Sequence, residues 1–198
     1  MKTENAILMR QARESLSGKW GLAIGAGVVY CLIVGVLGGI PKVGGLISLI
    51  ITGPMMLGAA IFSLSLSRKK DAEISQLFDG FKRFSKSFVA YLLMVLFVFL
   101  WTLLLIVPGI IAAFSYSQLF YILAEDNSIS AGDALKKSKK MMFGYKWKYF
   151  CLLCRFIGWG LLSILTLGIG FLWLIPYIQI SMVKFYDDVS VSSPEKTS

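Results

Sequence analysis

Residues 87–124, SFVAYLLMVLFVFLWTLLLIVPGIIAAFSYSQLFYILA, decide the fold, because these 38 consecutive residues include no charged side chain. As one straight helix rising about 1.5 Å per residue they would reach about 57 Å, nearly twice the roughly 30 Å of a bilayer's hydrocarbon core. The chain must therefore turn back within this stretch. Pro108 and Gly109 lie near its middle, where proline removes a helical donor and glycine accepts left-handed backbone angles, so they mark the predicted turn.

Three more uncharged runs, at 20–41, 43–67 and 156–183, exceed the roughly 18 apolar residues that indicate a membrane-spanning helix. Lys42 separates the first two, and the region entered at Tyr149 is predicted to double back near Thr166, Gly168 and Gly170. The sequence thus predicts an all-α, polytopic membrane protein with six transmembrane helices in three hairpins, at about 20–41, 43–67, 87–107, 110–124, 148–165 and 170–186. A single membrane domain would cover 1–188, followed by a polar tail at 189–198 that we expect to be disordered.

The composition also indicates a membrane protein. Hydrophobic residues make up 57% of the chain and charged residues 16%, whereas soluble domains average about 45 to 50% and about 25%. A chain with so few polar residues cannot cover its apolar surface in water. The basic N-terminal segment and the apolar stretch after it resemble a secretory signal, but that stretch exceeds the roughly 7 to 15 residues of a signal core and lacks a small-residue cleavage site. We expect it to be retained as the first span.

The positions of the basic residues predict the orientation. With the N-terminus in the cytoplasm, 18 of the 20 lysines and arginines fall in inner segments, leaving Lys42 outside and Arg155 within a span. An excess of positive charge on short cytoplasmic loops sets orientation, and a single span through 87–124 would place one large basic cluster outside. We therefore expect a multi-pass protein of the cytoplasmic membrane with both termini inside. All 11 acidic residues fall on the inner side, so we expect no outer domain.

Amphipathic segments precede the predicted hairpins, at about 3–18, 72–87 and 130–143, and we expect them to lie as interfacial helices on the cytoplasmic side. The third begins with Ser-Ala-Gly-Asp at 130–133, which resembles a capping box. The basic side chains of the second and third segments are candidate contacts for lipid or a partner: Lys82, Arg83, Lys86, Lys136, Lys137, Lys139 and Lys140. Each would be attracted to anionic headgroups by about 1 kcal/mol. The alternative is that these charges only fix the topology.

The expected partners follow from this placement. They are the bilayer with its anionic headgroups and either a membrane protein or a second copy of the chain. Gly21/Gly25 and Gly35/Gly39 form small-x-x-x-small pairs, which predict close packing between helices. Nucleic acid is not expected despite the net charge of +9, because that charge is distributed as membrane orientation demands.

The sequence offers no recognisable catalytic, cofactor-binding or metal-binding constellation, and we expect the protein not to be an enzyme. It has no histidine, which removes the usual general base and imidazole ligand. Cys151 and Cys154 form a C-x-x-C, but they fall inside a predicted membrane helix without a second pair, so we interpret them as small apolar residues. No phosphate-binding loop is present.

Arg155 is the one ionisable residue within a predicted span. Charges at that depth are costly and often functional, and its candidate partners are Glu125, Asp126 or a lipid phosphate; alternatively, Arg155 extends to the inner surface. With Tyr116, Gln118 and Gln179 it forms a candidate intramembrane polar site. Pro54 and Pro176 interrupt the second and sixth predicted spans, where they produce either a packing kink or a discontinuous helix lining a site.

A weak internal repeat accompanies the hairpins. Each is preceded by a Lys-aromatic step, beginning at Lys19, Lys82 and Lys146, at intervals of 63 and 64 residues. Each also ends with charged residues on the inner side, at 68–71, 125–126 and 187–188. A fixed period can indicate repeated architecture. The alternative is that any three hairpins that obey the same charge rule look alike.

Several ordered segments carry a resemblance to a known family. They are LLLIVPGII at 103–111, SYS at 115–117, FYILAED at 120–126, ISA at 129–131, KWK at 146–148, FIGW at 156–159, LTLGIG at 165–170, LIPY at 174–177 and FYDD at 185–188. From about Arg10 onward the chain resembles a family of uncharacterised bacterial integral membrane proteins catalogued as domain of unknown function 975. That resemblance implies location and architecture, not a mechanism. Arg155 stands where the family pattern leads us to expect a small polar residue, which weakens a family-wide role for it.

Two functional hypotheses remain open. The first is a non-enzymatic membrane component that assists a partner or maintains the cell envelope, and it needs no polar cavity. The second is a small transporter or exporter of peptides or lipid-like molecules, which needs a cavity at mid-membrane depth lined by Ser115, Tyr116, Gln118 or Gln179.

Overall fold

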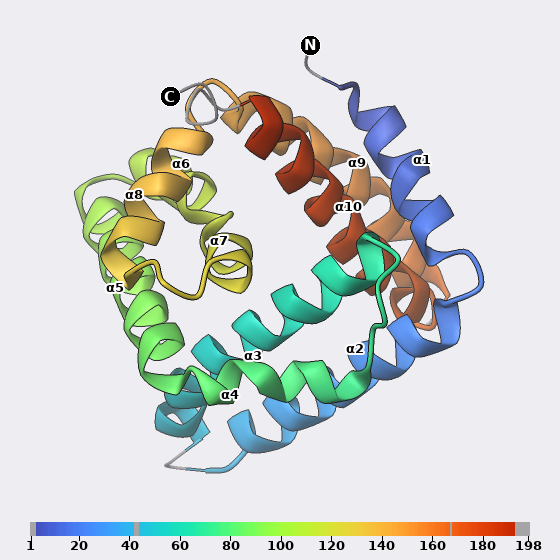
Figure 1. Ribbon diagram of the computed structural model, residues 1–198, viewed down its shortest axis with the longest axis horizontal. Helices are drawn as coiled ribbons and strands as arrows, with labels where there is room; N and C mark the ends of the chain where they lie inside the picture. Colours follow the sequence, from blue (N-terminus) through green and yellow to red (C-terminus); the bar gives the residue numbers. More distant parts are fainter. Residues whose placement is uncertain (1–2, 42–43, 167, 193–198) are drawn as a thin grey trace.

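The computed structural model describes residues 3–41, 44–166 and 168–192, which form helices and connecting turns without a strand. The all-α prediction is therefore confirmed for this part of the chain (Figure 1). The helices are α1 (Asn5–Leu16), α2 (Trp20–Gly38), α3 (Gly44–Ser67), the 3-10 helix η1 (Ile74–Phe78), α4 (Asp79–Lys82), α5 (Phe84–Leu104), α6 (Ile106–Tyr116), α7 (Leu119–Glu125), α8 (Ala131–Met141), α9 (Lys146–Leu165) and α10 (Phe171–Ser192).

Five stretches of the described chain are long and apolar enough to cross a membrane. They are Trp20–Gly38, Ile47–Ser67, Phe84–Leu104, Ile106–Glu125 and Lys146–Leu165. The sixth predicted span corresponds to α10, which has 22 residues but carries Lys184, Asp187 and Asp188 in its second half and is not one of the five. Both α3 and α10 continue through their internal prolines, Pro54 and Pro176, so neither proline interrupts its helix.

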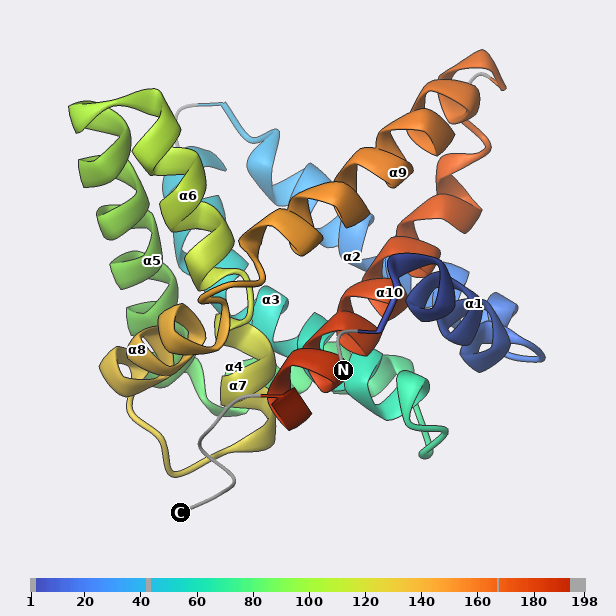
Figure 2. The same ribbon diagram turned by 90° about the horizontal axis from the view of Figure 1, so that it is seen from above.

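The long uncharged stretch does turn back, but three residues earlier than predicted. α5 ends at Leu104, Leu105 is extended with φ −163° and ψ 146°, and α6 begins at Ile106 (Figure 2). Pro108 lies in the first turn of α6, where its missing N–H has no helical partner to lose. A Cβ on Gly109 would lie 2.1 Å from Thr102 Oγ1, so glycine is needed for close packing of the hairpin rather than for the turn.

The predicted span at 110–124 is two helices, α6 and α7, separated at Ser117 and Gln118. The Ser117 hydroxyl donates to the carbonyl of Phe114 at 2.9 Å, and the Gln118 amide donates to the Ser117 hydroxyl at 2.9 Å. Side chains that bond to nearby backbone groups compete with the helical ladder, which accounts for the break.

The interfacial helix predicted at 72–87 is wrong as a single element. The structure divides it into η1, α4 and the first turn of α5, and the backbone of η1 and α4 packs directly on α3. A Cβ on Gly58 would lie 1.8 Å from the Leu77 carbonyl oxygen, and one on Gly80 would lie 1.8 Å from that of Pro54. Leu77 is buried at this contact. Some of the apolar residues at helical spacing in this segment pack against α3, and others are exposed.

The glycine pairs predicted to mediate helix packing do not do so within the described chain. A Cβ on Gly21 or Gly35 would meet no atom within 4 Å, and one on Gly25 would meet only the Ile74 side chain. Glycines that do permit close approach include Gly109 in the α5–α6 hairpin and Gly53, Gly58 and Gly80, at the contacts of α3 with the segment that runs from η1 into α5.

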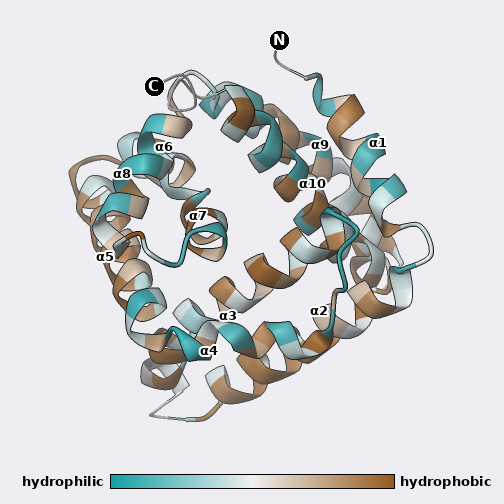
Figure 3. Ribbon diagram, in the orientation of Figure 1, coloured by the Kyte–Doolittle hydropathy of each residue, from teal (hydrophilic) through white to brown (hydrophobic). Residues whose placement is uncertain are grey.

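The helices form inner and outer groups. α3, α7 and α10 lie toward the middle of the molecule, and α2, α5 and α9 lie toward its edge (Figures 1 and 2). The largest buried cluster joins the inner helices through Leu57, Leu119, Leu123, Val183 and Phe185. Brown, apolar residues run along the outer helices, whereas teal residues concentrate in α1 and α8 (Figure 3).

The contacts between helices repeat cyclically. The outer helices α2, α5 and α9 each contact the second helix of their own hairpin, and each also contacts a helix from the second half of another hairpin: α2 contacts α10, α5 contacts α3, and α9 contacts α6. The short segments behave likewise, since η1 and α4 pack on α3, α8 packs on α6 and α7, and α1 packs on α10. This pattern favours the repeat interpretation of the sequence over coincidence.

Candidate functional site

Charged ends of the three inner helices converge on Arg68, which directly follows α3. Its guanidinium contacts the carboxylate of Glu125, the last residue of α7, and lies 2.6 Å from Asp187 Oδ1 of α10. The Tyr186 hydroxyl donates to Glu125 Oε2 at 2.6 Å. Partial burial would lower the pKa of Arg68, but its hydrogen bonds to Asp187 and Glu125 outweigh burial and raise it. The charged residues that end the three predicted hairpins are therefore bound to one another.

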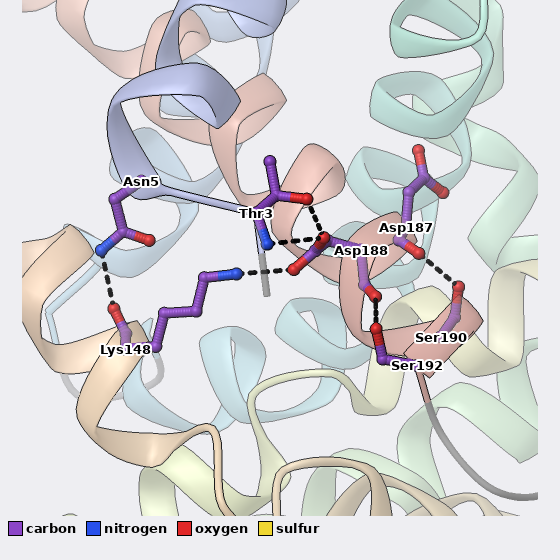
Figure 4. A network of polar contacts seen from close by, with 7 residues as sticks. All are labelled: Thr3, Asn5, Lys148, Asp187, Asp188, Ser190 and Ser192. Atoms are coloured by element: carbon purple, nitrogen blue, oxygen red, sulfur yellow. Dashed lines mark hydrogen bonds and ion pairs between the residues drawn. The ribbon is translucent and has the colours of Figure 1, made fainter. Parts of the chain in front are cut away.

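A second ion pair joins the two helices of the last hairpin, and hydrogen bonds attach the N-terminal segment to it (Figure 4). Lys148 Nζ lies 2.5 Å from Asp188 Oδ2, and the Thr3 hydroxyl donates to the same carboxylate. Asn5 adds a hydrogen bond to the Lys148 carbonyl at 3.0 Å. The ammonium also lies 5.6 Å from the centre of the Phe185 ring, a cation–π contact.

The Lys148–Asp188 pair is largely excluded from solvent, with side-chain exposures of 13% and 9%. Burial would raise the pKa of Asp188, but the hydrogen bonds from Lys148 and Thr3 hold it below its usual value. Removing one member of such a pair leaves an uncompensated charge, at a cost of roughly 3 to 5 kcal/mol. We refer to Arg68, Glu125, Asp187, Lys148 and Asp188 together as the inner charge cluster.

Basic side chains also bind carbonyl groups where α3 ends. Lys184 Nζ donates to the Ser67 carbonyl at 3.0 Å, and the Ser15 hydroxyl donates to the same oxygen at 3.3 Å. Lys19 donates to the Lys70 carbonyl at 3.3 Å. Carbonyls at a helix C-terminus lack helical partners and carry partial negative charge, so cations stabilise them.

Two of the residues predicted to contact lipid also donate to carbonyl groups at a helix end. Arg83 Nη1 donates to the Leu123 carbonyl at 3.1 Å, and Lys86 donates to the Asn127 carbonyl, both at the end of α7. Lys82 pairs with Asp79 at 2.7 Å. Lys82, Arg83 and Lys86 are thus bound to groups of the protein itself. The sequence alone does not predict this role, because it depends on α5 beginning beside the end of α7.

The second predicted basic group lies on α8. Half of the capping box predicted at its start is present, because the Asp133 backbone N–H donates to Ser130 Oγ at 3.1 Å. The Asp133 carboxylate accepts from the Ser130 hydroxyl at 2.7 Å, where a full capping box would have it accept from the Ser130 backbone N–H. Lys136 lies 3.4 Å from Asp133. Lys139 and Lys140 are exposed, and Lys137 lies partly exposed beside them. The opposite face of α8 is buried, including Ala134, Leu135, Ser138 and Met141.

The four residues of the candidate intramembrane site are not brought together. No hydrogen bond, ion pair or principal hollow among the described residues joins any two of Tyr116, Gln118, Arg155 and Gln179. Tyr116 and Gln118 are buried, Gln179 Oε1 lies 3.5 Å from the Ser63 hydroxyl, and Arg155 is exposed on α9.

The predicted protein partners of Arg155 are engaged elsewhere. Glu125 binds Arg68, and the Asp126 carboxylate accepts hydrogen bonds from the hydroxyl and backbone N–H of Ser128 at 2.6 and 2.8 Å. These bonds lower the pKa of Asp126. Of the three candidate partners of Arg155, a lipid phosphate is the one that remains.

The largest of the principal hollows is aromatic. It has a volume of about 480 Å³ and lies between α1, α2, α9 and α10, where Trp20, Trp159, Trp173 and Tyr177 line it together with Arg13. The three cysteines are free thiols, with Cys31 and Cys154 exposed and Cys151 partly buried. Sequence reasoning missed this aromatic hollow because its residues lie up to 164 positions apart, from Arg13 to Tyr177.

Across the described ranges the protein is all-helical, with five stretches that are long and apolar enough to span a membrane. The chain belongs to the family described as Protein of unknown function (DUF975), whose model matches residues 1–115 and 102–193. No curated protein and no solved structure matches the chain.

Proposed function

We propose that the protein is a non-enzymatic component of the cytoplasmic membrane, built as six spans in three hairpins with both termini in the cytoplasm, that maintains the envelope or assists a membrane partner. Its outer helices would face lipid or that partner. Its interfacial segments and basic residues would lie on the cytoplasmic side. The inner charge cluster would hold the three hairpins together at the cytoplasmic end.

The observation that carries this proposal is the apolar surface of the outer helices. Leu103 is 74% exposed, Leu165 79% and Leu32 58%, and many other large apolar side chains on α2, α5 and α9 are exposed as well. Soluble proteins rarely present apolar patches larger than a few hundred Å², because water disfavours them. A hydrocarbon environment removes that cost, and the charged residues of the cluster lie at the helix ends, as a bilayer requires.

Ser115 and Tyr116 line one hollow of about 250 Å³, but no principal hollow joins them to Gln118 or Gln179, and this separation favours a sealed component over a transporter. Gln118 and Gln179 line none of the five principal hollows between the described helices, whose volumes run from about 220 to about 480 Å³. The second candidate function, transport or export of peptides or lipid-like molecules, is favoured by the hollow beside Ser115 and Tyr116 and by one further observation. The buried Gln118 Oε1 atom has no hydrogen-bond partner among the described residues.

Single-cysteine labelling tests the topology. In a background with Cys31, Cys151 and Cys154 replaced by alanine, a membrane-impermeant maleimide should modify Lys42→Cys from outside intact cells. It should modify Lys137→Cys only after the membrane is opened. The native thiols form no disulfide, so their removal should leave the fold intact. Labelling of position 137 from outside would contradict the proposed orientation.

A deletion strain tests the role. We expect it to become sensitive to stresses on the cell envelope, and expression of Gln118→Leu should restore resistance because the sealed component needs no polar side chain there. Restoration by the wild type but not by well-expressed Gln118→Leu would favour transport instead.

A further inference from the structure

A hollow with one apolar and one cationic end lies between α5, α6, α8 and the start of α9. Its volume is about 250 Å³. Trp101 near the end of α5 and Pro108 in the first turn of α6 form its apolar end. Lys139 and Lys146 line the hollow as well.

The position of α8 places the lysines at the opposite end. The Ser138 hydroxyl donates to the Ser115 carbonyl at 2.8 Å, so α8 crosses α6 at Ser115 and sets Lys139 beside it. Pro108 is seven residues away along the helix, roughly 10 Å at 1.5 Å per residue. Ile111 and Ala112 form the wall between these ends.

The two lysines lack a counter-charge within the protein. No carboxylate of the described residues lies within 4.0 Å of either ammonium, and the two act on each other electrostatically. Like charges that share a hollow repel one another unless an anion lies between them. By contrast, the lysines described above near the ends of α3 and α7 are bound within the protein. Lys19, Lys86 and Lys184 donate to carbonyl oxygens, and Lys82 pairs with the Asp79 carboxylate.

The hollow also contains an unused hydroxyl. Tyr116 is 7% exposed and lines the hollow, and its hydroxyl makes no hydrogen bond to a described residue. The Tyr116 oxygen is not among the enclosed polar atoms that lack a partner, so it is accessible from outside the protein. The Tyr116 hydroxyl is therefore available to donate to a ligand held by the lysines.

Exposed aromatic residues place this end of the hollow at a membrane surface. Phe143 is 83% exposed and Trp147 is 74% exposed, on either side of Lys146 in the sequence. Aromatic side chains concentrate at the level of lipid headgroups, where an apolar ring meets a polar environment.

We propose that this hollow binds an anionic phospholipid of the inner leaflet, with its phosphate between Lys139 and Lys146, a hydrogen bond from Tyr116 and an acyl chain along Ile111 and Trp101. Basic pockets between membrane helices on the cytoplasmic side suit such headgroups. A free phosphate ion would match the lysines but leave the apolar wall uncovered. The proposal rests on the membrane placement proposed above.

The test compares lipid retention by the full chain, purified in a non-ionic detergent, by native mass spectrometry. Phosphatidylglycerol and phosphatidylcholine with the same acyl chains are the two probes. We expect the wild type to retain phosphatidylglycerol preferentially and Lys139→Gln/Lys146→Gln to bind it roughly thirtyfold more weakly, about fivefold for each lysine. Lys136→Gln/Lys140→Gln is the matched control, because it removes two charges from α8 outside the hollow, and its affinity should stay within about twofold of the wild type. Equal losses in the two double variants would overturn the site.

Two further measurements separate the chemistry from general charge. Tyr116→Phe keeps the ring but removes the hydroxyl, and it should weaken retention of phosphatidylglycerol several-fold without changing that of phosphatidylcholine; an unchanged ratio would contradict the role of the hydroxyl. Inorganic phosphate should not displace the lipid beyond the effect of sodium chloride at equal ionic strength, and specific displacement would identify an ion site instead. If cysteine labelling supports the topology while retention shows no preference for phosphatidylglycerol, this site alone is wrong.

Discussion

The inner and outer helices of this protein differ in what they bury, although both groups are apolar. About half of the α3 span and of the span formed by α6 and α7 is buried inside the protein, with 50% in each case. The corresponding fraction is 11% in α2, 11% in α5 and 17% in α9. Yet α5 and α2 have a higher mean hydropathy than the two inner spans, although α9, also an outer helix, has the lowest of the five.

Hydropathy alone would therefore place the wrong helices in the core. Without water around them, membrane helices associate through close packing and hydrogen bonds rather than through an excess of apolar area. The inner helices supply both, with Gly53 and Gly58 at close contacts, Ser63 bonded to Gln179 of α10, and the Ser115 carbonyl bonded to Ser138 of α8. Small residues alone do not identify the interior, because glycine-rich α2 is an outer helix; the inner spans differ in that their glycines and polar groups contact other helices.

The largest effect should come from adding one methyl group to an inner glycine. Gly58→Ala would place its Cβ 1.8 Å from the Leu77 carbonyl oxygen, and because the obstacle is backbone, η1 must move away from α3. We expect a loss of roughly 4 kcal/mol or more, in the range of the most damaging single substitutions. Thermal unfolding in detergent, followed by size-exclusion chromatography, measures it. The matched control is Gly21→Ala on the outer helix α2, where the methyl meets open space; comparable losses in both variants would remove the distinction between the two groups.

Breaking the buried ion pair should have the next largest effect. Asp188→Leu leaves the Lys148 ammonium without its carboxylate, and we expect a loss of roughly 3 kcal/mol in the free energy of unfolding. Lys148→Met/Asp188→Leu should recover most of it, because neither charge is then unpaired. Glu14→Gln is the control, since it breaks the Arg10–Glu14 pair, which is 72% and 66% exposed, and should change stability by less than about 0.5 kcal/mol. A double variant as unstable as Asp188→Leu would show that the pair is not the cause.

Acid should weaken the same contact. Because the pKa of Asp188 is depressed in the folded protein, its contribution to stability is complete above the ordinary carboxyl value of 3.8 and is lost as the pH falls through the lower folded value. Part of the decrease in melting temperature between pH 6 and pH 3 should therefore be absent in Asp188→Asn. Parallel profiles for the two proteins would exclude a contribution from this carboxylate.

The smallest effect should come from the contacts at the end of α7. Arg83→Gln removes the hydrogen bond to the Leu123 carbonyl, and we expect a loss of about 1 kcal/mol. Lys82→Gln, next to it, removes only an exposed pair with Asp79 and should cost less than half as much. Equal melting temperatures for these two variants would show that Arg83 does not stabilise α7.

The sequence predicted the features that depend on local chemistry. The length of the uncharged stretch required a reversal, which the structure places at Leu105, and the Ser130 cap requires only residues three apart. The charges at the hairpin ends were also visible, including Arg68, Glu125 and Asp187. Their mutual pairing was not, because it depends on how three separate helices meet.

The errors arose where tertiary packing determines the local structure. The segment 72–87 has helical spacing, but contact with α3 at Leu77 and Gly80 divides it. Gly21 and Gly35 have the spacing of a packing motif but face away from the described helices, whereas Gly58 and Gly80, which do pack closely, belong to no such motif. Spacing within one helix cannot show which face its neighbours cover.

The contact between α1 and α10 joins a helix that is synthesised early in translation to one that is synthesised at its end. Thr3 binds Asp188, which lies 185 positions later in the sequence. The contact between α1 and α10 can therefore form only after the last helix has been synthesised. A chain that stops before α10 leaves the Leu8 and Ala12 face of α1 without its cover. Burial of this apolar face of α1 therefore depends on the presence of the last helix.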